Sequence, residues 1–103
     1  MKILLACSSG MSTGMLVKKM KEAAEVQGTQ AEIWAVGQVM VEEEMKKADV
    51  LLVGPQMRFL KAKYEPLAIE LNIPIDVINP MIYGRCDGQG ALKQAMDLIK
   101  ANK

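Results

Sequence analysis

The chain has 103 residues, 50% of them hydrophobic, and carries 13 lysines and arginines against 12 aspartates and glutamates. This length and composition indicate one domain, residues 1–103, whose core needs neither a metal nor a disulfide. A net charge of +1 and an aromatic content of 4% argue against a nucleic-acid-binding protein. Because the chain contains no histidine, it has no imidazole to act as a base, bind a metal or carry a phosphoryl group. We expect no metal and no cofactor.

The two cysteines, Cys7 and Cys86, are spaced neither as zinc ligands nor as a disulfide framework. We therefore predict a reducing, cytoplasmic location. The apolar run before Cys7, residues 3–6, is far shorter than the ~7–15 apolar residues of a secretion signal. No other run approaches the ~20 apolar residues of a membrane-spanning helix, so we predict no insertion into the membrane.

Three short segments have the pattern of strands that are buried on both faces of a parallel sheet. They cover residues 3–6, 50–53 and 75–78. Two are uninterrupted apolar runs, and the third is apolar except for Asp76. A fourth segment, residues 31–35, alternates polar and apolar side chains and indicates a strand nearer the edge of the sheet.

Segments with the period of an amphipathic helix separate these runs. The first begins near Met15 and stops at Gly28. The others cover residues 39–47, 57–71 and 90–101. We expect Pro66 to kink the third of these four helices or divide it in two.

The alternation of strands and helices predicts an α/β domain. The simplest topology is a single open four-stranded parallel sheet with an order near 2-1-3-4, flanked by helices on both faces. In such sheets, binding sites form at the carboxyl ends of the strands. Three loops lie there, at residues 7–14, 54–57 and 79–88.

The loop after the first predicted strand consists mostly of small residues and hydroxyl groups. It reads Cys7, Ser8, Ser9, Gly10, Met11, Ser12, Thr13, Gly14. Gly10 permits backbone angles that let successive N–H groups converge on one point, and we expect Ser12 or Thr13 to cap the following helix. The segment therefore predicts a phosphate-binding loop similar to that of the cysteine phosphatases.

Cys7 stands at the mouth of this loop. The N–H groups that would bind a phosphate also stabilise a thiolate, which is the nucleophilic form of cysteine. The alternative is that Cys7 is a small, buried apolar residue at the end of a strand. Its position directly before a Gly/Ser/Thr loop and a helix favours the nucleophile.

A phosphatase of the cysteine-loop type needs an arginine in the loop to stabilise the transferring phosphoryl group. Here Thr13 occupies that position, and both arginines, Arg58 and Arg85, lie outside the loop. The loop is therefore better suited to storing and passing on a phosphoryl group than to hydrolysing one. A small cysteine-dependent phosphatase or arsenate-reductase-like enzyme is the alternative. A receiver-like module is disfavoured, because no acidic residue stands before Gly14 to bind Mg²⁺.

Three motifs follow the predicted strands in order. They are Cys-Ser-Ser-Gly-Met-Ser-Thr from Cys7, Val-Gly-Pro-Gln ending at Gln56, and Tyr-Gly-Arg-Cys-Asp-Gly from Tyr83. Together they resemble the IIB component of the sugar phosphotransferase system, in its lactose/cellobiose/diacetylchitobiose branch. The resemblance covers essentially the whole chain.

This resemblance implies a phosphocarrier. Cys7 would accept a phosphoryl group from a phosphohistidine of a cytosolic IIA protein. It would then pass the group to a β-linked disaccharide entering through the IIC membrane component. The resemblance also implies that the backbone of residues 8–14 binds the phosphoryl group, and that Gln56, Tyr83 and Asp87 border the site.

Four further features allow a simple structural interpretation beside a functional one. An Asp-Gly pair such as Asp87 and the next residue usually makes a turn, which we favour over a catalytic acid. We interpret Cys86 as a bystander and the glutamates at 42–44 as a solvated helix face. For Met11 we leave open whether it contacts partners or folds onto the core. Because a relay must face two partners in turn, we expect a monomer.

Overall fold

The computed structural model describes residues 1–7 and 11–102, in which four strands form one parallel sheet. The strands are β1 (Lys2–Cys7), β2 (Glu32–Gly37), β3 (Val50–Val53) and β4 (Ile75–Val77). Their order is β2-β1-β3-β4, with every neighbouring pair parallel. This confirms the predicted α/β fold and its order, including the edge position of the alternating strand β2.

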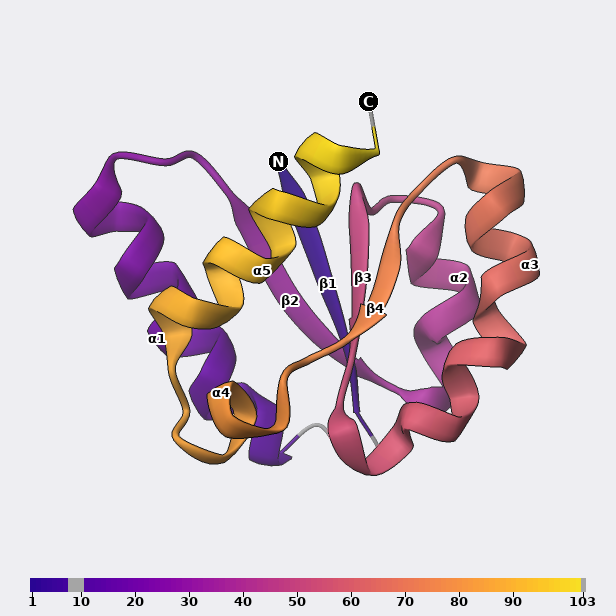
Figure 1. The fold of residues 1–103 in the computed structure, drawn as a ribbon, viewed down its shortest axis with the longest axis horizontal. Helices are drawn as coiled ribbons and strands as arrows, with labels where there is room; N and C mark the ends of the chain where they lie inside the picture. Colours follow the sequence, from indigo (N-terminus) through magenta and orange to yellow (C-terminus); the bar gives the residue numbers. More distant parts are fainter. Residues whose placement is uncertain (8–10, 103) are drawn as a thin grey trace.

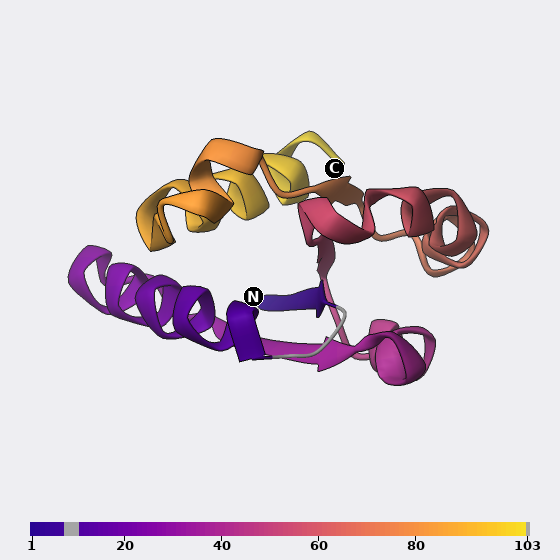
Figure 2. The same ribbon diagram turned by 90° about the horizontal axis from the view of Figure 1, so that it is seen from below.

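Helices cover both faces of the sheet. They are α1 (Met11–Gln27), α2 (Val41–Met45), α3 (Lys61–Leu71), α4 (Pro80–Gly84) and α5 (Gly88–Ala101), with the 3₁₀ helices η1 (Gln38–Met40) and η2 (Pro55–Leu60). Figure 1 and Figure 2 show α1 and α5 on one face and α2 and α3 on the other. Within the described residues, none of these helices is both long and apolar enough to cross a membrane.

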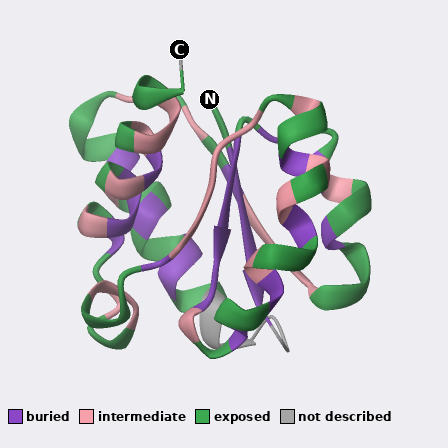
Figure 3. Cartoon of the chain, turned by 45° about the vertical axis from the view of Figure 1, so that its right-hand side comes forward, coloured by how far each residue is buried: buried purple, intermediate pink, exposed green. Residues whose placement is uncertain are grey.

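The sheet separates two apolar clusters, and β1 contributes to both. Ile3 and Leu5 pack into the α1/α5 cluster, whereas Leu4 and Ala6 pack into the α2/α3 cluster. All four side chains are fully buried, and Figure 3 shows burial concentrated on the central strands. Because successive side chains of a strand point to opposite faces, a central strand covered on both sides must be apolar throughout.

Helix α1 begins at Met11, earlier than the predicted start near Met15. The apolar period starts only where the helix reaches the core, at the buried residues Leu16 and Met20. The sequence of the first turn, Met-Ser-Thr-Gly, shows no apolar period, so periodicity misses it. The predicted stop is confirmed, because the helix ends before Gly28, which has a left-handed φ of 72°.

The helix predicted over residues 57–71 is divided, but not at Pro66. The break lies inside η2, where Met57 takes a non-helical φ of −116°, and α3 starts later, at Lys61. Pro66 stands inside α3, which continues to Leu71. A proline removes one backbone donor, and the remaining hydrogen bonds and the buried Tyr64 and Ala68 keep the helix intact.

Other boundaries also differ from the sequence-based expectation. The helix predicted over residues 39–47 consists of η1 and the short α2, and α5 begins at Gly88. Helix α4 lies in a segment predicted as a loop. It starts at Pro80, and the Asn79 side chain accepts a hydrogen bond from the Met81 N–H (2.9 Å). An Asn-Pro pair suits a helix start, but five residues are too few to show a helical period.

Candidate active site

The carboxyl ends of the strands meet at one edge of the molecule, the lower edge in Figure 1. The Gly54 N–H donates to the carbonyl of Ala6 (2.9 Å), and the Ile78 N–H donates to the carbonyl of Val53 (2.8 Å). On the other side of β1, Cys7 pairs with Gly37 in the register of β2. The parallel ladder therefore brings all three predicted loops to the same edge.

Cys7 is fully buried in this structure. Its side chain packs into the α2/α3 cluster, and its thiol donates to the carbonyl oxygen of Val36, with 3.7 Å between sulfur and oxygen. Only a protonated thiol can donate such a hydrogen bond. In this conformation Cys7 is thus a thiol that is sheltered from solvent.

The predicted phosphate-binding loop is shorter than expected. Ser8, Ser9 and Gly10 lie outside the described residues, and Met11–Gly14 form the first turn of α1. The prediction that Ser12 or Thr13 caps the helix is therefore wrong, because both residues stand inside it. Helix α1 has no acidic residue in its first turn. Its N-terminal N–H groups and positive dipole end follow Cys7 closely in the chain.

Gln56 and Tyr83 are in contact, although 27 positions separate them in the chain. The Gln56 Nε2 donates to the Tyr83 hydroxyl over 3.0 Å, which joins η2 to α4. A Cβ atom at Gly54 would come within 3.0 Å of the Gln56 Oε1 and within 3.3 Å of the Ala6 carbonyl oxygen. The Gln56 side chain therefore folds back over Gly54, beside the residue that precedes Cys7. Sequence reasoning named Gln56 and Tyr83 but missed Gly54.

Asp87 is the N-cap of α5, so the Asp-Gly pair begins a helix where the sequence predicted a turn. Its Oδ1 accepts a hydrogen bond from the Gly90 N–H over 2.9 Å. The next residue, Gly88, packs directly on α1, because a Cβ atom there would collide with the backbone carbonyl of Lys19. The Asp-Gly pair thus starts α5 and lets it approach α1. Sequence reasoning missed this contact.

Cys86 lies apart from Cys7. It is half-buried with a left-handed φ of 53°, and it packs against the α1/α5 cluster on the opposite face of the sheet. Both thiols are free. The arrangement agrees with Cys86 as a bystander. Met11 was the other ambiguous residue, and its side chain lies outside the described part of the chain.

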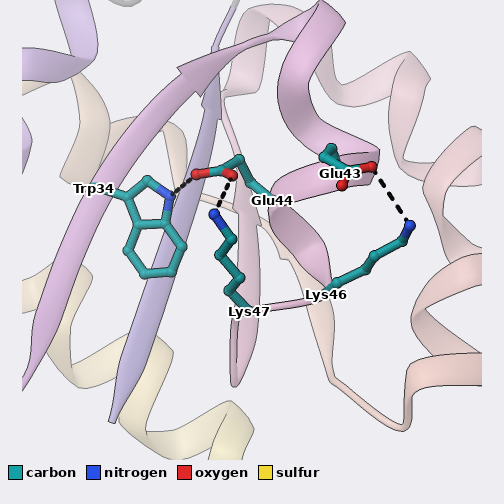
Figure 4. Close-up of polar contacts among 5 residues, drawn as sticks. All are labelled: Trp34, Glu43, Glu44, Lys46 and Lys47. Atoms are coloured by element: carbon teal, nitrogen blue, oxygen red, sulfur yellow. Dashed lines mark hydrogen bonds and ion pairs between the residues drawn. The ribbon is translucent and has the colours of Figure 1, made fainter.

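A second group of polar side chains lies along β2 and α2. Figure 4 shows the Glu44 carboxylate between the Trp34 indole, which donates over 3.0 Å, and the Lys47 ammonium at 3.1 Å. The hydrogen bond from Lys47 is the main cause that lowers the pKa of Glu44 below its usual value, and the Trp34 hydrogen bond adds to it. Glu42 and Glu43 are exposed, but Glu44 is half-buried, so the prediction of a fully solvated face is wrong at Glu44.

Tyr64 places a polar atom inside the α2/α3 cluster, which also contains Cys7. Its side chain is fully buried, and its hydroxyl finds no hydrogen-bond partner in the described structure. Burial raises the pKa of Tyr64, and the negative charge of Glu42 raises it further. No sequence pattern distinguishes this tyrosine from one with a bonded hydroxyl.

The chain matches a family model described as "PTS system, Lactose/Cellobiose specific IIB subunit" over residues 2–94. It is 56% identical, over 95% of each chain, to the oligo-beta-mannoside-specific EIIB component of Bacillus subtilis. It is 38% identical, over 94% of each chain, to the galactose-specific EIIB component of Lactococcus lactis subsp. cremoris.

Two solved structures share the fold. The cellobiose-specific IIB component of Borrelia burgdorferi superposes with a TM-score of 0.83 at 35% identity, over 100% of this chain and 94% of the other. The lactose-specific IIB domain of Streptococcus pneumoniae gives a TM-score of 0.86 at 19% identity, over 95% and 96%, and shows the likeness of fold alone. The chain therefore belongs to the family of lactose/cellobiose-specific IIB subunits of the sugar phosphotransferase system, phosphotransferases that work with IIA and IIC components.

Proposed function

We propose that Cys7 carries the phosphoryl group in this IIB subunit. It accepts the group from a phosphohistidine of the IIA component and passes it to a β-linked disaccharide taken up through the IIC component. The observation that carries the proposal is the place of Cys7, at the carboxyl end of the central strand β1 and shortly before the N-terminus of α1. The donor imidazole must come from another protein, because this chain contains no histidine.

The two transfers balance without a further reactant. In the first, the Cys7 sulfur attacks phosphorus, the P–S bond forms and the P–N bond to the donor imidazole breaks. The thiol proton passes to the departing imidazole nitrogen. In the second, a sugar hydroxyl oxygen attacks phosphorus, the P–O bond forms and the P–S bond breaks. The hydroxyl proton returns to the sulfur, which leaves the thiol as it began.

The first transfer requires Cys7 to turn from the Val36 carbonyl toward the N-terminus of α1. There the backbone N–H groups of residues 8–14 bind the phosphoryl oxygens, helped by the positive end of the helix dipole. The hydrogen-bonded pair of Gln56 and Tyr83 borders this position. Of the proposed border residues, Asp87 has the most clearly structural role, because its carboxylate caps α5.

The relatives support the proposed class of sugar. Their names specify oligo-beta-mannoside, galactose and cellobiose. We propose a β-linked disaccharide of the cellobiose, lactose or diacetylchitobiose kind. We further propose that the protein acts as a monomer in the cytoplasm, where Cys7 and Cys86 are kept as free thiols.

The test is a phosphorylation assay with phosphoenolpyruvate, the two general upstream proteins of the phosphotransferase system and the IIA component. We expect intact-mass spectrometry to show one phosphoryl adduct on the wild-type protein. The adduct is absent from Cys7→Ser and retained in the matched control Cys86→Ser. Circular dichroism confirms that both variants are folded.

Two results would contradict this proposal. One is an adduct on Cys7→Ser as abundant as on the wild type. The other is rapid, Cys7-dependent release of inorganic phosphate, which would favour the phosphatase alternative.

A further inference from the structure

A cavity of about 580 Å³ lies at the edge of the sheet that β2 forms, toward the end opposite Cys7. The strand residues that line it come from the starts of β1 and β2, namely Lys2 and the segment 31–34, whereas Cys7 is the last residue of β1. Lys21 of α1 and Glu44 of α2 line it from the two faces of the sheet. Small molecules bind in cavities of roughly 300–1,000 Å³.

A second cavity, of about 510 Å³, adjoins the first. The two cavities share Lys2, Lys21, Ala31 and Glu32 among their lining residues. We call the two together the β2-edge groove. Trp34 lines only the first cavity. The two shared lysines therefore stand where the cavities meet, beside the cavity that contains the indole.

Trp34 gives the first cavity a wall of fixed orientation. Its indole N–H donates to the Glu44 carboxylate over 3.0 Å, and the same carboxylate is paired with Lys47 at 3.1 Å (Figure 4). Trp34 is only half-buried, so part of its side chain is open to the groove. The electron-rich face of an indole attracts the polarised C–H groups of a sugar ring. Because the indole is already held in place, binding requires little further ordering.

Lys2 and Lys21 supply positive charge where the two cavities meet. Among residues 1–7 and 11–102, neither ammonium group forms an ion pair. Two unpaired ammonium groups from different elements suit the oxygens of a phosphate group. Glu32 is exposed and likewise forms no ion pair in that part of the chain. Its carboxylate accepts hydrogen bonds from hydroxyl groups.

We propose that the β2-edge groove binds a phosphorylated sugar. The sugar ring packs against Trp34, its hydroxyl groups donate to Glu32, and its phosphate lies between Lys2 and Lys21. A nucleotide also combines a flat ring with a phosphate, but its base offers few donors to the Glu32 carboxylate.

This site goes beyond the proposed function, because it lies at the other end of β1 from Cys7 and takes no direct part in either transfer. A phosphorylated sugar is what the proposed second transfer releases, so the ligand would be present wherever that transfer runs. Binding is measured on the unphosphorylated protein. A failure of Cys7 to carry the phosphoryl group would therefore leave the test of the groove intact.

The test uses Trp34 as its reporter, because it is the single tryptophan of the chain. Phosphorylated cellobiose is titrated into the protein while tryptophan fluorescence is recorded, and titration calorimetry measures the same binding independently. Cellobiose, inorganic phosphate and adenosine monophosphate are titrated in parallel. Lys2→Ala/Lys21→Ala removes both ammonium groups. Its matched control, Lys18→Ala/Lys100→Ala, removes two exposed lysines that do not line the groove. Circular dichroism shows that each variant is folded.

We expect phosphorylated cellobiose to change the fluorescence of Trp34 in a saturable way. The Lys2→Ala/Lys21→Ala variant should bind it about tenfold more weakly, because two charge-assisted contacts to the phosphate are lost. The control variant should bind it as the wild type does. Cellobiose and inorganic phosphate should each bind at least about tenfold more weakly than the phosphorylated sugar, because each makes only part of the contacts.

Four results would overturn the inference. The first is no saturable signal from phosphorylated cellobiose in either measurement, and the second is unchanged affinity in the Lys2→Ala/Lys21→Ala variant. The third is inorganic phosphate that binds as tightly as the phosphorylated sugar, which would leave a site for anions alone. The fourth is tighter binding of adenosine monophosphate, which would make the groove a nucleotide site.

Discussion

The two faces of the sheet are built differently. The buried members of the α1/α5 cluster are alanine, valine, leucine, isoleucine and methionine, and the two helices approach so closely that only glycine fits at position 88. The α2/α3 cluster contains two buried groups with polar hydrogens, the thiol of Cys7 and the hydroxyl of Tyr64. One of these is bonded to a backbone carbonyl and the other has no partner in the described structure.

This difference separates a face whose buried side chains are all apolar from a face that also buries a thiol and a hydroxyl. Close-packed apolar side chains contribute the most free energy per buried area, whereas an unpartnered buried hydroxyl costs about 1–3 kcal/mol. Cys7 precedes α1 in the chain, yet its thiol packs on the opposite face from that helix. The α2/α3 face thus shelters this thiol from solvent.

Gly88→Ala is the strongest test of the α1/α5 face. The new methyl group collides with the backbone carbonyl of Lys19, which cannot rotate away, so α5 must shift from α1. We expect the free energy of unfolding to fall by about 3 kcal/mol, as in an overpacked core. Urea denaturation monitored by circular dichroism measures the change.

The matched control for this substitution is Gly84→Ala. A Cβ atom at Gly84 meets nothing within 4 Å, and the residue lies in helix α4. Alanine favours a helix over glycine by roughly 0.5–1 kcal/mol, so the control should be neutral or slightly stabilising. An equally mild effect of Gly88→Ala would mean that α1 and α5 can move apart with little loss of stability. The α1/α5 face would then not be the more tightly packed of the two.

The sequence was sufficient to predict the sheet and the edge that carries the site. Apolar runs such as residues 50–53 are local and continuous, so they mark a doubly covered strand wherever they occur. Parallel strands then bring Cys7, Gln56 and Tyr83 to one edge by topology alone. The hydrogen bond between the last two follows from that placement.

The remaining features depend on contacts between distant segments. The fit of Gly88 on Lys19 is set by how two helices cross, and the Val36 carbonyl reaches Cys7 through the register of β1 and β2. Neither is encoded in a local pattern. The early start of α1 was missed because its first turn contributes no apolar period.

Tyr64→Phe tests whether the buried hydroxyl on the α2/α3 face lowers the free energy of unfolding. The substitution removes a fully buried hydroxyl that has no hydrogen-bond partner among the described residues and leaves the ring in place. We expect the free energy of unfolding to rise by about 1 kcal/mol, because the penalty for burying the hydroxyl disappears. The same denaturation assay measures it.

Tyr83→Phe is the comparison for Tyr64→Phe, because it removes the same hydroxyl group from a tyrosine that does form a hydrogen bond. Its hydroxyl accepts the Gln56 amide over 3.0 Å, so its loss should lower the free energy of unfolding by up to about 1 kcal/mol. The two substitutions should therefore have opposite signs. If Tyr64→Phe destabilises the protein as Tyr83→Phe does, the Tyr64 hydroxyl has a partner in solution, and the α2/α3 face is as well satisfied as the other.

We expect the smallest change in stability from a substitution at Glu44. This residue lies at the outer margin of the α2/α3 face, where Trp34 packs. The Lys47 and Trp34 hydrogen bonds lower the pKa of this carboxyl in the folded protein. Its stabilising contribution is therefore complete at pH values above the pKa of the unfolded chain, and it is lost as the pH falls through the lower, folded-state pKa. Glu44→Gln should flatten this part of the stability profile, measured by thermal unfolding from neutral pH into the acid range.

Glu43→Gln is the matched control, because Glu43 forms the equivalent exposed pair with Lys46 (3.4 Å) one position earlier on the same helix. Exposed ion pairs contribute little, so this variant should follow the wild-type profile. If the two variants have the same profile, the indole contact adds nothing to the Glu44 carboxylate. The half-buried position of Glu44 would then be a matter of packing alone, and the polar character of this face would be confined to Cys7 and Tyr64.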